Sequence, residues 1–401
     1  MQIPKTAKPG LQPIWTFSHS GGRWFKTTFT VRTDWPQFGF NARHTGHNPY
    51  ENVLSPSSVT GLGLIWRRQI GVWLRCAPFV ADGRAYVGTE GQFGAAAKIN
   101  LWALDASGGQ TRWTRSFDYV SACPAVHEHV LYVHGEESGK FGLYAIDAAS
   151  GDLLWKRFGQ WPAFSAPAVA NGVVFSARQE DLTAYRVDDG KRLWQQRTAE
   201  TVFTSPAVSN GVVLVGGYFR YLYAYRAEDG ALLWQHDIGS GINASPIVYR
   251  GLVYAASAGT VYAFNVADGA LAWRRQTGYS VSPGAVAHGV LYVAEAAFDA
   301  SGWHDRIHAL RASDGAKLWS RAFAGDNLSN APGLAVANGV VYMTSWSGQF
   351  RALDAHDGSV LKSIATGPVV GSPTVANGLV YIGSWNGKVQ AFGVSGSAAT
   401  R

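Results

Sequence analysis

The sequence has little of the side-chain chemistry from which many functional sites are built. Of its 401 residues, 2 are Cys and 2 are Met, and only 15% are Asp, Glu, Lys or Arg. Cys76 and Cys123 cannot form a disulfide framework, and the sequence has no CxxC pair, no Cys/His metal spacing and no CxxCH haem site. It also lacks the HExxH, GxSxG and P-loop motifs. These absences exclude disulfide scaffolds and the enzyme classes that those motifs define.

Charge and hydropathy exclude further classes. The net charge is +7, from 34 basic and 27 acidic residues, but the longest basic runs are pairs such as Arg67–Arg68. A nucleic-acid-binding protein normally concentrates its positive charge on one stripe, so we expect no nucleic-acid partner. No run of about 18 apolar residues is present to span a membrane. Residues 1–32 hold five basic residues and no acidic one, but they lack the unbroken apolar core of a signal peptide.

Glycine and aromatic residues are abundant instead. The chain has 47 Gly, and its 16 Trp, 17 Tyr and 19 Phe sum to 52 aromatic residues. An apolar share of 47% is typical of a globular protein. Many glycines beside many large side chains favour short strands joined by tight turns, with aromatic packing between them. A helical bundle, a coiled coil and a disordered chain are therefore excluded.

A sequence repeat determines the architecture. Seven blocks of eleven residues share Ala at the first position and Gly at the seventh, and six of them end in Trp, where the seventh has Lys362. Successive block ends are 42, 39, 40, 39, 46 and 43 residues apart. A period near 40 residues with several short strands per unit is typical of a β-propeller. The blocks are residues 103–113, 145–155, 184–194, 224–234, 263–273, 309–319 and 352–362.

Each repeat divides into four predicted strands. In the fourth repeat these are residues 205–209, 212–216, 222–226 and 231–236, from the innermost strand to the outermost. Asn-Gly and Asp-Gly pairs, which favour type I′ hairpin turns, join the first two strands in five repeats. These pairs are Asp82–Gly83, Asn171–Gly172, Asn210–Gly211, Asn338–Gly339 and Asn377–Gly378. Looser versions are Arg250–Gly251 and His288–Gly289, and Glu128–His129 has no Gly.

Eight inner strands are predicted, and each begins at a proline, because the first residue of a strand loses no ladder hydrogen bond. The eighth repeat, residues 372–394, has no outer strand of its own. We predict that residues 60–70 supply that strand, since closure of the ring removes exposed sheet edges. The prolines are Pro78, Pro124, Pro167, Pro206, Pro246, Pro283, Pro332 and Pro373.

The predicted fold is therefore an all-β, eight-bladed β-propeller of four-stranded antiparallel blades, closed by an N-terminal strand that completes the last blade. It forms a single domain over residues 34–396. Residues 1–33 are an N-terminal extension for which the sequence predicts no order, and residues 397–401 are a tail. Seven tryptophans at one equivalent place are predicted to pack between blades as structural residues: Trp66, Trp113, Trp155, Trp194, Trp234, Trp273 and Trp319.

The repeated block, Ala-x-Asp-x-x-x-Gly-x-x-x-Trp, resembles the tryptophan-docking motif of the PQQ-like repeat family. That family includes quinoprotein dehydrogenases and the BamB type of outer-membrane assembly lipoprotein, both of which are eight-bladed propellers. Residues 34–49 and 54–66 also resemble the lead-in to the first blade of quinoprotein dehydrogenases. The resemblance covers residues 34–394 and implies the fold, whereas a fold alone does not decide function. Relatives are usually periplasmic or extracellular, and no export signal in this sequence decides its localisation.

We expect function on the propeller face where the fourth-to-first and second-to-third connections emerge, because the opposite face carries short, repetitive hairpins. Second-to-third connections at residues 89–100, 134–142 and 295–306 are predicted to be long loops. Aromatic side chains with a few Asn, Asp and Arg can stack on and orient a ligand at such a mouth. The candidate mouth residues are Trp73, Arg75, Asp118, Tyr119, Trp161, Phe203, Asn243, Tyr279, Asn327, Trp346 and Trp385.

The resemblance to quinoprotein dehydrogenases implies the cofactor pyrroloquinoline quinone (PQQ) and calcium bound by Glu and Asn side chains, with an Asp as general base and often a disulfide between adjacent cysteines. Cys76 and Cys123 are 47 residues apart, so that disulfide cannot form. Two alternatives remain for this pair of cysteines: a disulfide between neighbouring blades, or two free thiols. The acidic residues of the long connections match no ligand set of the family. We therefore predict no catalytic residue, no metal ligand and no cofactor.

The sequence thus predicts a monomeric, non-catalytic scaffold that binds a protein segment or small ligand at the long-loop face, as a BamB-like module. One alternative is a PQQ-dependent quinoprotein dehydrogenase acting on an alcohol or sugar, with PQQ and calcium as cofactors. Another is the sensor domain of a signalling protein.

Overall fold

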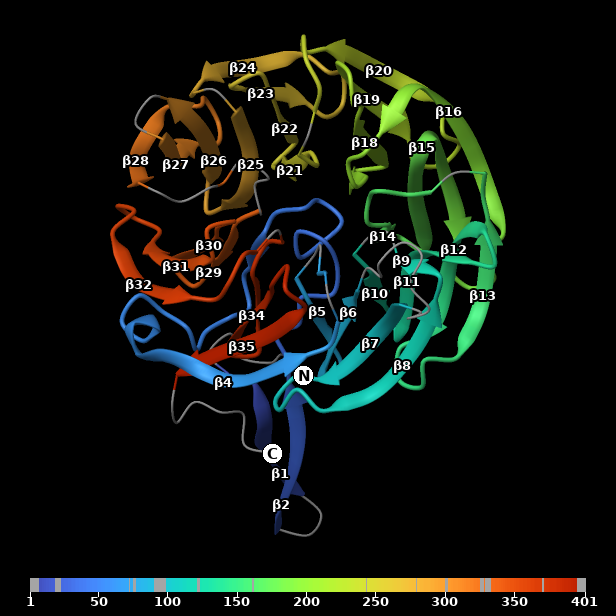
Figure 1. The fold of residues 1–401 in the computed structure, drawn as a ribbon. Coiled ribbons are helices and arrows are strands. Elements are labelled where there is room, and N and C mark those ends of the chain that lie inside the picture. Colours follow the sequence, from blue (N-terminus) through green and yellow to red (C-terminus); the bar gives the residue numbers. More distant parts are fainter. Residues whose placement is uncertain are drawn as a thin grey trace.

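The chain forms a ring of β-sheets in a computed structural model (Figure 1). The structure describes residues 7–18, 23–71, 73–74, 77–89, 99–120, 123–160, 162–242, 244–278, 280–299, 302–324, 328, 333–369 and 371–394. Within these ranges, eight sheets radiate from a central channel, and a separate two-stranded sheet lies outside the ring. No helix in the described ranges has the length and apolar character needed to cross a membrane.

The first four blades follow the chain in order. Blade 1 contains β5 (Phe79–Ala81), β6 (Arg84–Gly88), β7 (Ile99–Asp105) and β8 (Thr111–Phe117). Blade 2 contains β10 (Ala125–His127), β11 (Val130–Glu137), β12 (Lys140–Asp147) and β13 (Leu153–Phe158), with β9 (Tyr119–Val120) paired to β11. Blade 3 contains β14 (Ala168–Ala170), β15 (Val173–Arg186) and β16 (Arg192–Val202). Blade 4 contains β17 (Ala207–Ser209), β18 (Val212–Gly216), β19 (Tyr221–Arg226) and β20 (Leu232–Asp237).

The next three blades continue in the same manner. Blade 5 contains β21 (Ile247–Tyr249), β22 (Leu252–Ser257), β23 (Thr260–Asn265) and β24 (Leu271–Gln276). Blade 6 contains β25 (Ser280–Ala287), β26 (Val290–Asp299), β27 (Gly302–Arg311) and β28 (Lys317–Ala324). Blade 7 contains β29 (Ala335–Ala337), β30 (Val340–Thr344), β31 (Gln349–Asp354) and β32 (Val360–Ala365), with β3 (His47–Asn48) lying parallel to β29.

Blade 8 closes the ring. Its inner three strands are β33 (Thr374–Ala376), β34 (Leu379–Gly383) and β35 (Lys388–Val394), and its outer strand is β4 (Leu62–Gln69), which follows the 3-10 helix η1 (Val59–Gly61). β4 runs antiparallel to β35, with Trp66 opposite Ala391. The predicted eight-bladed fold and its closure by an N-terminal strand are therefore confirmed.

The hairpin turns have the geometry that their sequences require. Asn210 and Gly211 both have positive φ, 51° and 76°, as a type I′ turn demands. The turn of blade 2 has positive φ at Glu128 and His129, 46° and 67°, although neither is a glycine. This blade therefore holds two ordinary residues in the left-handed region, which only Gly, Asn and Asp occupy at low cost.

One tryptophan from each of seven blades contacts the next blade along the ring. Trp194 Nε1 donates a hydrogen bond to the carbonyl oxygen of Ala227 at 2.8 Å, and a Cβ on Gly230 would lie 2.6 Å from the Trp194 ring. The same indole-to-carbonyl bond joins Trp66 to Ala106, Trp113 to Ala148, Trp155 to Val187, Trp234 to Val266, Trp273 to Ala312 and Trp319 to Ala355. Lys362, which has the eighth such position, donates to Thr60 O at 2.9 Å.

Two of the predicted long loops differ from the sequence prediction. The connections at 134–142 and 295–306 are mostly continuations of β11–β12 and β26–β27, so they are long hairpins and not loops. The connection at 89–100 lies mostly outside the described residues. In the N-terminal extension, β1 (Gly10–Ser18) and β2 (Arg23–Val31) form a hairpin that the sequence analysis does not predict.

Candidate functional site

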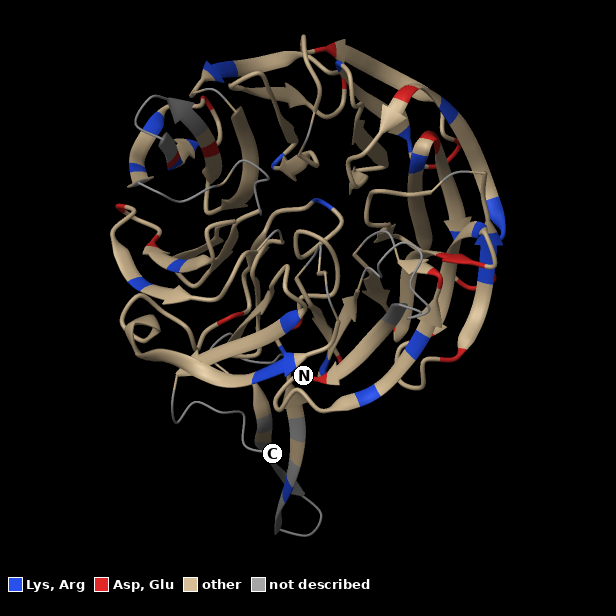
Figure 2. Ribbon diagram, in the orientation of Figure 1, with Lys and Arg blue, Asp and Glu red and all other residues tan. Residues whose placement is uncertain are grey.

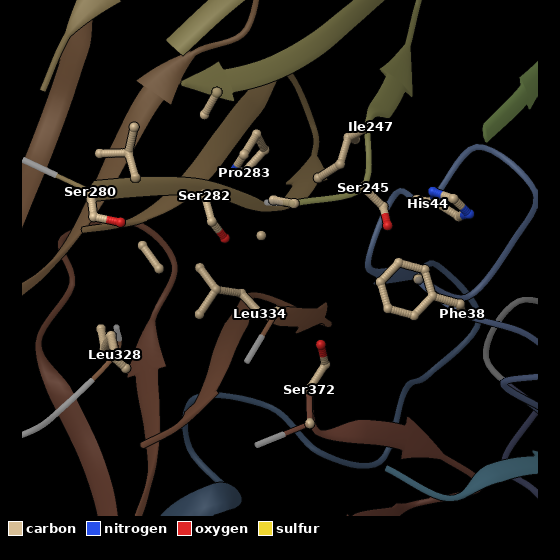
Figure 3. A pocket seen from close by; sticks show the side chains of 18 of the residues that line it. Phe38, His44, Ser245, Ile247, Ser280, Ser282, Pro283, Leu328, Leu334 and Ser372 are labelled. Carbon is tan, nitrogen blue, oxygen red and sulfur yellow. The ribbon is translucent and has the colours of Figure 1, made fainter. Parts of the chain in front are cut away.

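A cavity of about 920 Å³ occupies the central channel (Figure 3). Its described walls come from the inner ends of blades 5 to 8 and of blades 1 and 2, where the connections lead into the inner strands. A cavity of this volume is in the range of sites for small ligands. The channel is therefore the candidate functional site of this propeller.

The floor of the cavity is built by the segment that precedes the first blade. Trp35, Phe38, Gly39 and His44 of this segment line the cavity. The backbone turns sharply here, with positive φ at Gly39 (60°), Phe40 (76°) and His44 (55°). The segment thereby coils inside the channel instead of crossing it.

Residues 35–48 bond in turn to all eight inner strands, in each case at one valine of the strand. Trp35 and Val80 exchange two backbone hydrogen bonds. Five further carbonyl oxygens of the segment accept hydrogen bonds from inner-strand amides: Pro36 from Val126, Ala42 from Val208, Arg43 from Val248, Thr45 from Val286 and Gly46 from Val336. Side chains complete the series, Gln37 at Val169 and Asn48 at Val375. The free edges of the inner strands are thus paired, which satisfies buried backbone groups and closes one end of the channel. We call residues 35–48 the floor segment.

Gly46 shows how closely the floor segment fits. Its φ is +60°, and a Cβ at this position would lie 2.7 Å from Ala285 Cβ and 2.9 Å from the carbonyl oxygens of Gly284 and Leu334. Any larger residue would be strained and would push against the backbone of two blades.

The described lining carries hydroxyl groups but no charged side chain. Its polar side chains are Ser240, Ser245, Ser257, Ser280, Ser282, Ser372, Thr374 and Gln276. Ser245 and Ser282 stand directly before the inner-strand prolines, and Ser245 Oγ accepts a hydrogen bond from the amide of Ser205 at 2.9 Å. Phe38, Ile247 and Leu334 add apolar surface (Figure 3). The lining therefore suits an uncharged ligand with both polar and apolar groups.

His44 and Cys123 are the titratable residues of the described lining. His44 is buried, and its Nδ1 lies 3.0 Å from Pro246 O, so this nitrogen carries the proton that the carbonyl accepts. Burial lowers the pKa of His44 to about 4, so the ring is neutral at pH 7. Cys123 is a half-buried free thiol, and Cys76 lies outside the described residues. His44 therefore brings no charge into the cavity at neutral pH.

A buried acid–histidine pair lies behind the cavity wall in blade 6. Glu295 Oε2 and His308 Nε2 are 2.6 Å apart, and both side chains are buried. Glu295 packs so closely on Gly278, a lining residue, that a Cβ there would lie 1.6 Å from its Oε1. Gly278 thus separates the pair from the ligand space. Within the described part of the chain, no three His, Cys, Asp or Glu side chains gather in a way that could hold a metal ion.

Four of the candidate mouth residues lie in two aromatic groups. Trp385 contacts both Trp73, with ring centroids 5.7 Å apart, and Trp346, at 5.5 Å. Phe203 packs between Phe164 and Tyr218, at 5.0 and 4.9 Å. None of these candidates belongs to the described cavity lining.

Two further candidates lie in blade 2, and five lie outside the described residues. The Asp118 carboxylate accepts a hydrogen bond from the Ser138 amide at 2.5 Å, and Tyr119 pairs with Glu136 across β9 and β11. These two residues therefore order the long β11–β12 hairpin. Arg75, Trp161, Asn243, Tyr279 and Asn327 lie outside the described residues.

The serines and the floor segment that form the cavity were not predicted from the sequence. The Ser-Pro pairs were available as a signal, because proline marks the start of each inner strand and Ser245, Ser282 and Ser372, each directly before such a proline, line the cavity. The floor segment carries no local pattern that predicts its partners, since its hydrogen bonds reach residues far along the chain.

Comparison with known proteins places this structure among close relatives in fold. The profile of the family described as outer membrane protein assembly factor BamB matches residues 98–206, 178–331 and 303–398. The chain is also similar to 1-butanol dehydrogenase (cytochrome c) of Thauera butanivorans, at 28% identity over 145 residues. That match covers 33% of this chain and spans only 19% of the dehydrogenase.

Solved structures with the same fold include both enzymes and an assembly factor. A quinohemoprotein alcohol dehydrogenase of Pseudomonas putida HK5 has a TM-score of 0.74 at 15% identity, covering 92% of this chain and 81% of the enzyme. BamB of Moraxella catarrhalis has a TM-score of 0.66 at 17% identity, covering 83% of this chain and 99% of BamB. A europium-containing methanol dehydrogenase has a TM-score of 0.72 at 13% identity, covering 90% of this chain and 98% of the enzyme. At these identities the likeness is one of fold.

Proposed function

Because the chain belongs to the PQQ-like repeat family of BamB-type β-propellers, we propose that it is a non-catalytic binding module that takes a protein segment or small ligand into its central cavity. The observation that carries the proposal is the chemistry of the described lining, which presents serine hydroxyls, one amide and apolar side chains but no charge. An uncharged ligand can exchange its water for these groups without leaving a buried charge unpaired.

The cofactor of the quinoprotein enzymes provides the main alternative. PQQ carries three carboxylates, and calcium takes roughly six to eight oxygen ligands, usually with carboxylates among them. The described lining offers neither an Arg or Lys for the cofactor nor an Asp or Glu for the metal. These residues do not fit PQQ with calcium, which supports the binding module over the dehydrogenase.

Titration with PQQ and calcium separates the two functions. We expect no saturable binding by calorimetry and no dye-linked oxidation of 1-butanol, the alcohol suggested by the partial similarity to 1-butanol dehydrogenase. Saturable binding together with turnover would establish the dehydrogenase and refute the binding module.

A peptide display library provides the direct test of the cavity. We expect peptides without charged residues to be enriched on the unmodified protein and lost on Ser282→Trp, which fills the cavity. Leu271→Trp is the matched control, because Leu271 is 50% exposed on the outer strand of blade 5 and far from the lining. Peptides retained equally by both variants would place binding elsewhere and contradict the proposal.

A further inference from the structure

The hairpin formed by β1 and β2 stands apart from the propeller. Nine residue pairs join the two strands, from Gly10 opposite Val31 to Ser18 opposite Arg23, and neither strand pairs with another described strand. Figure 1 shows the hairpin projecting beyond the rim of the ring. Nine residues at about 3.4 Å each extend for roughly 30 Å. A two-stranded hairpin is marginally stable alone in water, so a surface that covers this one would stabilise it.

The base of the hairpin is fixed to the turn face of the propeller. Asn52 Nδ2 donates to Ala7 O at 3.0 Å before β1, and after β2 the Thr33 amide donates to Asn377 Oδ1 at 2.7 Å. Arg32 and Asp82 form an ion pair at 3.1 Å. The two ends of the hairpin at its base are therefore held by the propeller, and the strands point away from the ring (Figure 1). We call the hairpin the arm.

The register concentrates aromatic and basic residues at the far end of the arm. The four pairs next to the tip are Trp15 with Lys26, Thr16 with Phe25, Phe17 with Trp24, and Ser18 with Arg23. Towards the base, β2 carries Thr27, Thr28 and Thr30, of which Thr28 and Thr30 are exposed, and the paired residues of β1 include Leu11 and Ile14. Both tryptophans and both basic residues of the two strands thus lie in the four pairs next to the tip.

The charge of this region has one sign. Residues 1–32 contain Lys5, Lys8, Arg23, Lys26 and Arg32 and no acidic residue, which gives five positive charges and no negative one. The described part of the arm in Figure 2 likewise shows basic and no acidic colour. The rest of the chain has both signs in similar number, with 29 basic residues (34 less 5) and 27 acidic ones.

We propose that the arm is a membrane-contact element that inserts its aromatic end into the interface of a bilayer rich in anionic lipid. Trp and Phe favour the region between head groups and acyl chains, and each nearby Lys or Arg is attracted by anionic head groups. An open sheet edge cannot enter the hydrocarbon core, but at a depth of about 5–10 Å the unpaired backbone groups still reach water and head groups. This depth corresponds to two or three residue pairs, and three of the four pairs next to the tip contain an aromatic residue.

The arm contributes no residue to the described lining of the central cavity, so membrane contact is independent of the proposed function. Since the arm is rooted on the turn face, contact with a membrane leaves the opposite mouth of the cavity accessible to a ligand.

Co-sedimentation of the full chain with vesicles tests the arm. We expect binding to phosphatidylcholine vesicles that contain about a third phosphatidylglycerol, little binding to pure phosphatidylcholine, and loss of binding as salt is raised. Charge reversal in Arg23→Glu/Lys26→Glu should weaken binding to anionic vesicles by roughly tenfold or more, because each basic residue near such a surface contributes about a factor of five. The aromatic variant Trp15→Ser/Trp24→Ser should lose binding to a similar extent at low salt.

The control is Arg192→Glu/Arg274→Glu, which reverses two exposed charges on the outer strands of blades 3 and 5. It should bind anionic vesicles nearly as well as the unmodified chain, and all variants should keep the same melting temperature because the arm lies outside the propeller. Equal binding to neutral and anionic vesicles, or equal loss in the control, would overturn the proposal. So would a dimer in light scattering that the arm variants convert to monomer, since the arm would then cover a second copy.

Discussion

The contact between blades depends on two residues, a tryptophan on one blade and a glycine on the next. The glycine has positive φ, 75° at Gly230, and the indole ring of Trp194 lies where its Cβ would be. The repeated Gly is thus required twice, by the turn and by the ring that covers it. This explains why the sequence holds many glycines and many aromatics together, and why a single substitution in the pair should be felt at a blade interface.

We predict that Trp194→Ala lowers the free energy of unfolding by roughly 3–5 kcal/mol, as truncations of buried aromatics do. The loss combines the buried ring, 8% exposed, with the hydrogen bond to Ala227. Urea denaturation measures the change. Leu193→Ala is the control, because the neighbouring Leu193 is 47% exposed and should change stability by less than about 0.5 kcal/mol. Equal effects of the two substitutions would contradict a structural role for the tryptophan.

Buried histidines should make the protein less stable in mild acid. Burial, with the nearby Arg178, lowers the pKa of His134 to about 3, and its nitrogens contact Ser165 O at 2.9 Å and Ser176 Oγ at 2.7 Å. The unfolded chain takes up this proton below a pKa of about 6.5, whereas the folded protein does so only near 3. The contribution of His134 to the free energy of unfolding is therefore fully present above pH 6.5, and it is lost as the pH decreases from there towards 3.

At about pH 5 the loss from His134 amounts to about 2 kcal/mol, that is, 1.5 pH units below the unfolded pKa. His134→Gln should be less stable at neutral pH but should show a difference between pH 7.5 and 5 that is smaller by about this amount. Denaturation curves at both pH values measure the difference. An unchanged difference would mean that His134 is already protonated in the folded protein.

Strands and turns followed from the sequence wherever the signal is local. The Asx-Gly turns and the inner-strand prolines placed the strands of the fourth repeat to within two residues, since both signals act on the chain where they stand. The floor segment and the arm were not predicted. The hydrogen bonds of Ala42 and Gly46 reach Val208 and Val336, so no window of sequence contains both partners. The cavity was not predicted either, because its described lining comes from six blades and the floor segment, which are far apart in the sequence.

The hairpin turn of blade 2 offers a test of this local logic. Replacing its Glu128–His129 pair by Asn-Gly should raise the free energy of unfolding by roughly 1 kcal/mol, since two residues leave a costly left-handed conformation. The contact between His129 and Asp82 is lost, but His129 is exposed, so that loss is small. The reverse exchange in blade 4, Asn210→Glu/Gly211→His, should destabilise by a similar amount. Thermal melts of the two variants measure these changes. A melting temperature that rises in both variants, or falls in both, would contradict the prediction.

The ring as a whole is closed at two places, and the two can be separated. β4 completes blade 8 through its pairing with β35, and the floor segment bonds to the inner strand of every blade. The first closure joins two neighbouring blades, whereas the second ties all eight to one segment of the chain. Because exposed inner edges would leave buried backbone groups unpaired, the floor segment should contribute to stability as well as to the shape of the cavity.

Truncation from the N-terminus should therefore reduce stability in steps. Removal of residues 1–30 deletes the arm and should change the melting temperature little. Removal of residues 1–48 keeps β4 but deletes the floor segment, which should lower the melting temperature sharply and open the channel from end to end, with increased binding of a hydrophobic dye. Removal of residues 1–66 should leave a chain that aggregates, because blade 8 loses its outer strand. If the chain without residues 1–48 has the same melting temperature as the chain without residues 1–30, the floor segment only fills the channel and β4 alone closes the ring.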